Sequence, residues 1–437
     1  MMRIVRCRSR SVVSALVAVA ALAGLPVITA APALAAPPEG ACRDPQPASP
    51  VVPDLPYAQR TLDLKHTWQH STGAGITVAV IDSGVDADHP QLQGKVWPGR
   101  DFFLVGDLPG NFDCESHGTA VASIIVGTPT AGVGFAGVAP DARILPIRVT
   151  DKELTDDGNP VPIDPNVVAT GIRYAADQGA KVINLSLSGY ADFNVIKDAV
   201  AYAQSKDALL VAAVGNRQDK GAGPSYPAAN EGVLGVGSIN IEGARSRGSQ
   251  IGDYVDIMAP GENVLAATRA GGHNYWTGTS FATPFVAGTA ALVRSAWPNL
   301  TAPQVAERIM ATADPSRGGK RSFDYGSGIV DPYRAVTEDL STKDPGIMPA
   351  VVDPPVDHDA MREVAWWDRM GTGAKLGAGG VLVAIVVTAV VAWAVPRGRR
   401  RRWLADRQAP LPAVKPRQEP PDQIFLFPPP PIEQARH

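Results

Sequence analysis

Cysteine, histidine, aromatic residues and an excess of either charge are all scarce in this sequence. Its 437 residues contain three Cys and seven His, and the aromatic share is 6%. These few potential ligands nowhere take the spacing of a metal site, so we expect no bound metal ion. The formal net charge is only −3. Without a broad basic patch the chain cannot neutralise phosphates over a long surface, which excludes nucleic acid as a partner.

The basic residues cluster only at the two ends of the chain, a distribution typical of membrane topology. Near the N-terminus four arginines precede an apolar run from Ser11 to Ile28, and Ala33-Leu34-Ala35 has the small-x-small pattern of a signal-peptidase site. We therefore predict a signal peptide over residues 1–35 and a mature chain that starts near Ala36. An uncleaved N-terminal anchor is the alternative.

A second apolar run occupies residues 375–396. About 21 uncharged residues from Leu376 to Pro396 can cross a hydrocarbon core of roughly 30 Å. Arginines follow between Arg397 and Arg402, and positive charge marks the cytoplasmic side. We predict a single-pass protein of the cell membrane, with one transmembrane helix, an extracytoplasmic central part and a basic, Pro-rich cytoplasmic tail over residues 397–437. The alternative is a buried core helix, but its basic and Pro-rich flank offers nothing to bury it against.

The three cysteines reduce to one candidate disulfide. Cys7 leaves with the signal peptide, so Cys42 and Cys114 remain as a pair in a compartment that permits oxidation. Their disulfide would tie the extended N-terminal segment to the loop just before His117. Closing a loop of about 70 residues would stabilise the fold by roughly 4 kcal/mol. Two free thiols are the alternative.

The central part of the chain, residues 61–340, has the pattern of an α/β domain. Short apolar runs typical of buried parallel strands alternate with amphipathic stretches. The runs are Ile76–Ile81, Ile144–Val149, Lys181–Leu187 and Leu209–Val214, and the stretches include Asn166–Gln178 and Phe193–Gln204. We predict a mostly parallel central sheet with helices on both faces. A Pro-rich extended segment over residues 36–60 precedes this domain, and a Pro-rich linker over 341–374 follows it.

Two polar residues stand at the borders of apolar segments. Asp82 ends the apolar run Val78–Ile81, at the carboxyl end of a predicted strand, where ligands gather in open α/β sheets. His117 opens a run of small and apolar residues that predicts a buried helix. Taken alone, each has a structural interpretation, Asp82 as a turn former and His117 as a packed side chain.

A third segment, Gly278 to Gly288, places Ser280 at the start of a predicted helix among small residues. The Ser280 hydroxyl would there lie near backbone N–H groups and the positive end of the helix dipole, which stabilise an oxyanion formed on an attacked carbonyl. The alternative is a simple helix N-cap. An N-cap, however, requires neither small residues on both sides nor Pro284 inside the helix.

The three segments, in the order Asp82, His117 and Ser280, resemble the signature blocks of the subtilisin-like serine proteases. The resemblance spans about Leu62 to Val336. It implies a subtilisin-like fold with Ser280 as nucleophile, His117 as general base and then acid, and Asp82 orienting the imidazole. The chemistry agrees, because serine is a poor nucleophile until a neighbouring base, itself held in one tautomer, takes its proton. Such a reaction needs no cofactor.

The resemblance also covers the substrate cleft. Asn216 matches the family's oxyanion-hole asparagine, with a simple turn residue as the alternative. The strand Lys181–Leu187 matches the family strand whose end pairs with extended peptide backbone, which implies substrate contacts from Ser186, Leu187, Ser188 and Gly189. The family usually has Gly where this chain has Ser188, and the added Cβ would narrow the first specificity pocket or shift the strand.

The order of segments along the whole chain is similar to that of the mycosins, the membrane-anchored proteases of actinobacterial type VII secretion systems. The similarity implies a partner, the type VII secretion complex of the actinobacterial cell envelope, and secreted proteins as substrates. The alternative is a mainly structural component of that complex, with proteolysis secondary.

Two further expectations concern the N-terminal segment and the acidic loop after Asp151. Only about 25 residues separate Ala35 from Arg60, too few for an independently folded pro-domain. We predict that this segment wraps the domain and stays attached through Cys42. The loop carboxylates Asp156, Asp157 and Asp164 are predicted to be solvated surface, with a structural Ca²⁺ site as the alternative.

Overall fold

The computed structural model describes residues 40–42, 44–104, 107–152, 161–221, 223–315, 321–340 and 358–400. The chain divides into two units, residues 1–353 and 354–437. The predicted signal peptide, the linker up to residue 357 and the tail beyond residue 400 lie outside the described residues.

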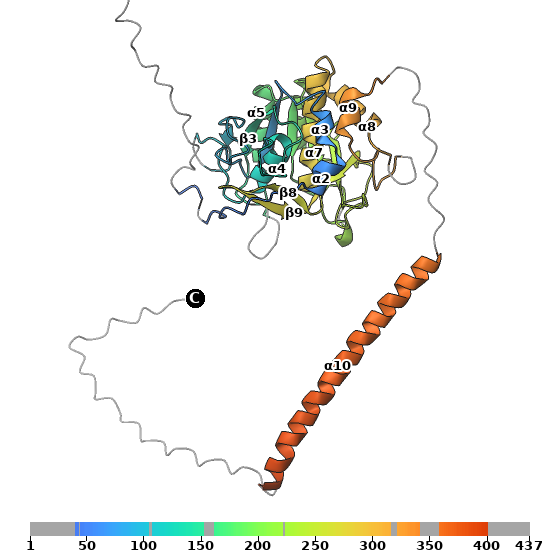
Figure 1. Cartoon of the computed structure of the whole chain (residues 1–437). Coiled ribbons are helices and arrows are strands. Elements are labelled where there is room, and N and C mark those ends of the chain that lie inside the picture. Colours follow the sequence, from blue (N-terminus) through green and yellow to red (C-terminus); the bar gives the residue numbers. More distant parts are fainter. Residues whose placement is uncertain are drawn as a thin grey trace, which may run out of the picture. The chain divides into compact units, whose positions relative to one another are not determined.

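A seven-stranded sheet forms the centre of the first unit (Figure 1). Its strands lie in the order β2-β3-β1-β4-β5-β6-β7, and all the neighbouring pairs are parallel. They are β1 (Thr77–Asp82), β2 (Arg100–Asp101), β3 (Arg143–Arg148), β4 (Val182–Leu185), β5 (Leu209–Ala213), β6 (Leu234–Ile239) and β7 (Ile257–Pro260). The chain runs from β1 to β3 on one side and enters β4 on the other. The carboxyl end of β1 is therefore a topological switch point, where open α/β sheets bind ligands.

Helices cover both faces of this sheet, as the sequence predicted. Along β1, Val78 and Val80 belong to one hydrophobic core and Ala79 and Ile81 to the other, because successive side chains of a strand point to opposite faces. The first core includes α4 (His117–Val126) and α7 (Thr279–Ala296), which lie side by side (Figure 1). The second core includes α5 (Pro165–Asp177) and α6 (Asn194–Ser205).

Shorter elements complete the first unit. The helices are α2 (Tyr57–Thr61), α3 (Leu64–Thr67), α8 (Ala302–Ala311) and α9 (Pro332–Thr337), with a 3₁₀ turn at Gln218–Lys220. The strands β8 (Val264–Ala267) and β9 (His273–Trp276) form an antiparallel hairpin. Because α2 begins at Tyr57, the last residues of the predicted extended segment are helical.

The N-terminal segment lies along the β8–β9 hairpin. The Ser49 N–H donates to the carbonyl oxygen of Gly271 at 3.0 Å, and the Pro50 carbonyl accepts from the N–H of His273 at 3.0 Å. The Val52 N–H donates to Nδ1 of His273 at 3.4 Å. Together with the disulfide between Cys42 and Cys114, these bonds show that the described part of the segment lies against the domain and is tied to it.

The second unit contains α10, one continuous helix over His358–Arg400 (Figure 1). It includes the predicted span at 375–396 and begins well before it, so residues 358–374 of the predicted linker are helical. These residues contain good helix formers and no proline, which accounts for the earlier start. Within the part of the chain that the structure describes, no helix is long and apolar enough to cross a membrane.

Candidate active site

The carboxyl end of β1 and the first residue of α4 bring Asp82 and His117 together. Nδ1 of His117 lies 2.7 Å from Oδ1 of Asp82, and only 8% and 3% of the two side chains are exposed. The same carboxylate oxygen accepts the N–H of Ser83 at 2.7 Å. A carboxylate in this position accepts a hydrogen bond from Nδ1–H and thereby favours the tautomer in which Nε2 is the basic nitrogen of the ring.

Gly118 permits this close approach of α4 to β1. A Cβ at Gly118 would lie 2.0 Å from the carbonyl oxygen of Gly84 and 3.1 Å from the Asp82 side chain. The Gly118 N–H donates to Oγ of Ser83 at 3.0 Å. All residues of α4 are buried, which confirms the predicted buried helix. The absence of a side chain after His117 is thus a condition for the contact between Asp82 and His117.

Ser280 is the second residue of α7 and is only 7% exposed. Gly278 precedes the helix with a φ of 154°, a conformation that strongly favours glycine. The ring of Phe281 lies 5.0 Å from the imidazole of His117, measured between centroids. The start of α7 is therefore packed against the start of α4, and Ser280 lies in the neighbourhood of the buried pair.

Asn216 follows β5 and is held against the same helix start. Its Oδ1 accepts the N–H of Thr279 at 2.8 Å, and Oγ1 of Thr279 accepts the N–H of Gly215 at 3.2 Å. A Cβ at Gly278 would lie 3.3 Å from Nδ2 of Asn216. Because Oδ1 is bonded to α7, the orientation of the amide is fixed and its NH₂ group remains for another acceptor.

The four predicted substrate-binding residues differ in how they are placed relative to the cleft. Leu187 and Ser188 line a cleft of about 720 Å³ together with Ser280 and Asn216. Ser186 is buried, and its Oγ donates to the carbonyl oxygen of Ser280 at 2.7 Å. Gly189 also lines the cleft, but both of its backbone groups are bonded to Tyr226, at 2.8 and 2.7 Å. Ser186 thus holds the backbone of Ser280 in place. The backbone groups of Gly189 are already bonded and cannot pair with a substrate strand.

A layer of polar residues that the sequence analysis missed lies behind Asp82 and His117. Buried Asp113 accepts the hydroxyl of Ser83 at 3.1 Å, and both the N–H and the hydroxyl of Thr119 at 2.9 and 2.6 Å. Burial raises the pKa of Asp113, while the hydrogen bonds from Thr119 and from the N–H of Glu115 oppose the rise. The layer links the loop before His117, the residue after Asp82 and the first turn of α4.

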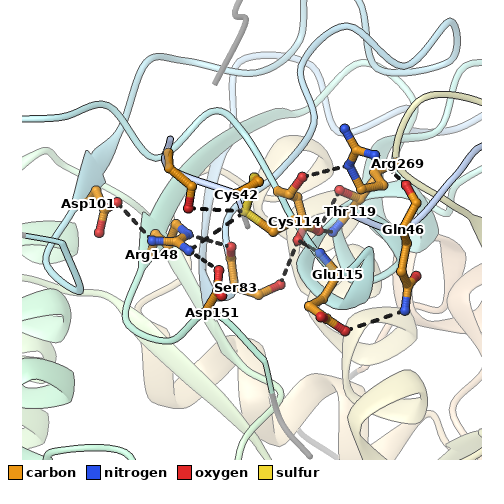
Figure 2. The surroundings of a disulfide bond; sticks show 12 residues. Cys42, Gln46, Ser83, Asp101, Cys114, Glu115, Thr119, Arg148, Asp151 and Arg269 are labelled. Carbon is orange, nitrogen blue, oxygen red and sulfur yellow. Dashed lines mark hydrogen bonds and ion pairs between the residues drawn. A yellow bond between two sulfur atoms is a disulfide. The ribbon is translucent and has the colours of Figure 1, made fainter. Parts of the chain in front are cut away.

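Arg148 extends this layer to the neighbouring strands. It pairs with Asp82 in the register of β3 on β1 and is fully buried. Its Nη1 lies 2.9 Å from Asp101 at the end of β2, Nε donates to the carbonyl oxygen of Ser83 at 3.0 Å, and Nη2 contacts Asp151 (Figure 2). A buried guanidinium with this many acceptors holds the ends of three strands together.

The predicted disulfide is present beside Arg148 (Figure 2). Arg269 lies on its other side, where Nε donates to the carbonyl oxygen of Asp113 at 2.9 Å and Nη1 contacts the carbonyl oxygen of Gln46. The Gln46 N–H donates to the carbonyl oxygen of Cys114 at 3.0 Å. The N-terminal segment thus supports the loop that leads into His117.

No group of three His, Cys, Asp or Glu side chains that could hold a metal ion occurs among the residues described. Of the acidic loop, Asp156 and Asp157 lie outside those residues. Asp164 caps α5, where its carboxylate accepts the N–H of Asn166 at 2.8 Å.

Known proteins share the sequence and the fold around this site. A model of the subtilase family matches residues 73–328, more than half of the chain. Mycosin-1 of Mycobacterium tuberculosis is 35% identical over 71% of this chain and 81% of its own. Thermitase of Thermoactinomyces vulgaris is 35% identical over 66% of this chain and 99% of its own. A solved structure of the serine protease MycP1, an essential component of the type VII (ESX-1) secretion system, is 35% identical, covers 69% of this chain and 97% of its own, and gives a TM-score of 0.58.

Proposed function

This chain belongs to the subtilase family of serine proteases, and from that premise we propose that it is a membrane-anchored extracytoplasmic endopeptidase with Asp82, His117 and Ser280 as its catalytic triad. The observation that carries the proposal is the buried 2.7 Å contact between Asp82 and His117, beside the helix start that bears Ser280. Three sequence-distant segments supply the three residue types that activated serine chemistry requires.

The reaction follows from these roles. Oγ of Ser280 attacks the carbonyl carbon of a peptide bond while Nε2 of His117 takes its proton. Asp82 accepts a hydrogen bond from Nδ1–H and stabilises the imidazolium that forms. His117 then gives its proton to the leaving amine, and an acyl-enzyme remains on Ser280. Water, activated by the same imidazole, hydrolyses the ester and restores Ser280.

Asn216 is proposed to stabilise the oxyanion of each tetrahedral intermediate. Its Oδ1 is occupied by the Thr279 N–H, so its NH₂ group is the end available for a developing negative charge. The start of α7 adds the positive end of a helix dipole at the same place. Donors fixed in advance are effective because they need no reorganisation during the reaction.

The cellular setting is proposed from the ends of the chain and from its relatives. The uncharged run from Leu376 to Pro396, with arginines directly after it, supports a single membrane anchor and an outward-facing protease domain. The mycosin relatives, one of which is a component of a type VII secretion system, support that complex as partner and its secreted proteins as substrates.

Labelling with a fluorophosphonate probe tests the nucleophile directly. We expect the full-length protein, solubilised in detergent, to be labelled, and a Ser280→Ala variant to remain unlabelled. A Ser205→Ala variant is a matched control, because Ser205 is exposed at the end of α6 and does not line the cleft. Absence of labelling in a folded wild-type protein would contradict the proposed triad.

A mainly structural role in the secretion complex makes a different prediction for the same variant. The MycP1 relative is an essential component of its system, which keeps this second function in view. If the role is structural, cells that carry Ser280→Ala retain secretion, whereas deletion of the whole gene abolishes it. If proteolysis is required, the two strains lose secretion alike.

A further inference from the structure

Two cations line the cleft beside Asn216. Arg217, the next residue, and Lys220 border the same cleft as Ser280, whereas none of the described lining residues is Asp or Glu. Neither cation forms an ion pair with any residue that the structure describes. Among the described residues, the cleft therefore has a net positive lining.

The Arg217 side chain lies against an aromatic ring, and its backbone is held in a turn. Its guanidinium carbon lies 5.5 Å from the centroid of the Tyr190 ring, within the range of a cation–π contact. Burial raises the pKa of Tyr190, so the ring stays neutral at ordinary pH. The Arg217 carbonyl accepts the N–H of Lys220 at 3.0 Å, which closes the 3₁₀ turn. A guanidinium stacked in this way keeps the N–H groups at its edge free for a planar anion.

The proposed reaction brings one substrate residue near this charge. If the attacked carbonyl lies between Ser280 and Asn216, the side chain of the residue that carries it would lie in the cleft that Leu187, Ser188 and Arg217 line. The partly exposed ring of Phe193, which also lines the cleft, would cover the methylene groups of that side chain.

We propose that the cleft selects peptides with an acidic side chain, Glu before Asp, on the residue immediately before the cut. This inference rests on the proposed function, because it assumes that Ser280 is the nucleophile. Arg217 would bind the carboxylate through paired N–H groups, and Lys220 would add a second positive charge at the mouth. Glu is favoured over Asp because its longer stem reaches past Ser188 towards Arg217.

Matched fluorogenic peptides test the proposal with the full-length protein in detergent. They differ only at the residue before the cut, which is Glu, Gln, Lys or Phe. We expect kcat/KM for Glu to exceed that for Gln about tenfold, since the ion pair forms near water rather than in the core. The preference should shrink as salt is raised from about 0.1 M to about 1 M, because the screening length falls from about 10 Å to about 3 Å.

Variants assign the preference to one residue. Arg217→Gln should bring the Glu to Gln ratio close to one, and Arg217→Glu should make Lys the preferred residue. Arg60→Gln is a matched control, because Arg60 is exposed on α2 and does not line the cleft. The control should keep the wild-type ratio.

The outcomes separate this proposal from the one it rests on. Equal rates for Glu and Gln, or a preference for Phe through Tyr190 and Phe193, overturn the acidic selectivity while leaving the protease intact. If Ser280 is labelled by the fluorophosphonate but no peptide is cleaved, labelling rates with phosphonate probes that carry Glu-like and Gln-like side chains replace the cleavage rates, and equal rates overturn the proposal. Failure of Ser280 to label overturns the proposed function itself.

Discussion

The two sides of the cleft are built in opposite ways. On the Asp82 side, the polar side chains of Asp82, Ser83 and Asp113 are buried and bonded to one another or to nearby backbone. On the Asn216 side, Asn216 and Ser188 are exposed. The difference lies in how the side chains are held. Those on the Asp82 side are fixed by buried polar partners, whereas Asn216 is bonded to α7 through its Oδ1 and leaves its NH₂ group facing the cleft, where Ser188 is also exposed.

The largest effect is expected from Asp82→Asn on the buried side. The amide would donate to Nδ1 of His117 rather than accept from it, so the imidazole would carry its proton on the wrong nitrogen. We expect kcat to fall about 10⁴-fold, the magnitude found in another serine-protease triad. Steady-state kinetics measure the fall, and circular dichroism controls for folding. A loss of less than about tenfold would mean that His117 is oriented without Asp82.

On the exposed side, Asn216→Ala should lower kcat by roughly 10²–10³-fold, a magnitude known from another member of this family. KM should change little, because the amide acts on the oxyanion and not on the ground state. Ser188→Gly is the matched control on the same side. It should alter which peptides are cleaved and leave kcat for the best peptide nearly unchanged. A large rise in KM for Asn216→Ala would assign this residue to substrate binding.

Removal of the disulfide affects only one of the two sides of the cleft. The bond supports the loop before His117, on the Asp82 side. With Cys42 and Cys114 both replaced by Ser, the free energy of unfolding should fall by roughly 2–4 kcal/mol. The N-terminal segment would retain the backbone bonds of Ser49 and Pro50. Urea denaturation measures the change. A midpoint equal to that of the wild type would show that those bonds suffice to hold the segment.

The smallest effect is expected on the pH dependence of stability, through His273 of the β8–β9 hairpin, which accepts a hydrogen bond from the N-terminal segment. Burial, with a contribution from neighbouring His89, lowers the pKa of His273 to about 4. Unfolding restores a value of about 6.5, so between these limits the unfolded chain binds a proton that the folded one does not. Stability should therefore fall as pH drops from about 6.5 to about 4, by on the order of 2 kcal/mol after allowance for solvent screening.

Thermal unfolding across this pH range tests the effect. His273→Gln should flatten the profile, and His66→Gln should not, because His66 is exposed on α3. Since Nδ1 of His273 accepts the Val52 N–H, the acid-induced loss should be accompanied by faster hydrogen exchange at Val52. An unchanged slope in His273→Gln would exclude this histidine as the cause.

Local sequence patterns were sufficient for the parts of the fold that have strong local signals. The run Ile76–Ile81 predicted β1, and Leu209–Val214 predicted β5, because buried parallel strands are continuously apolar. The sequence pattern gave no indication of β6, whose Gly235 and Gly237 dilute the apolar run, nor of the short hairpin β8–β9. Such strands form through pairing with neighbours and not through their own propensity.

In the candidate site, too, local sequence patterns predicted some residues and missed others. Asp82, His117, Ser280 and Asn216 were predicted as site residues because each stands in a distinctive run of residues. Arg148 was missed, because its partners Asp101, Ser83 and Asp151 come from separate segments and meet only in the folded chain. The one available signal was a charge at the end of an apolar run, a position that is normally solvent-exposed.

Helix α7 has a consequence for the order in which the enzyme acquires activity. It packs against β1, β4, β5, β6 and β7, and it carries Ser280 at its start. During synthesis, which proceeds from the N-terminus, Asp82 and His117 are made long before α7. This face of the sheet is covered only when α7, which follows the strands in the chain, has been made. An incomplete chain therefore lacks the proposed nucleophile, and we expect it to be unable to cut itself or its neighbours.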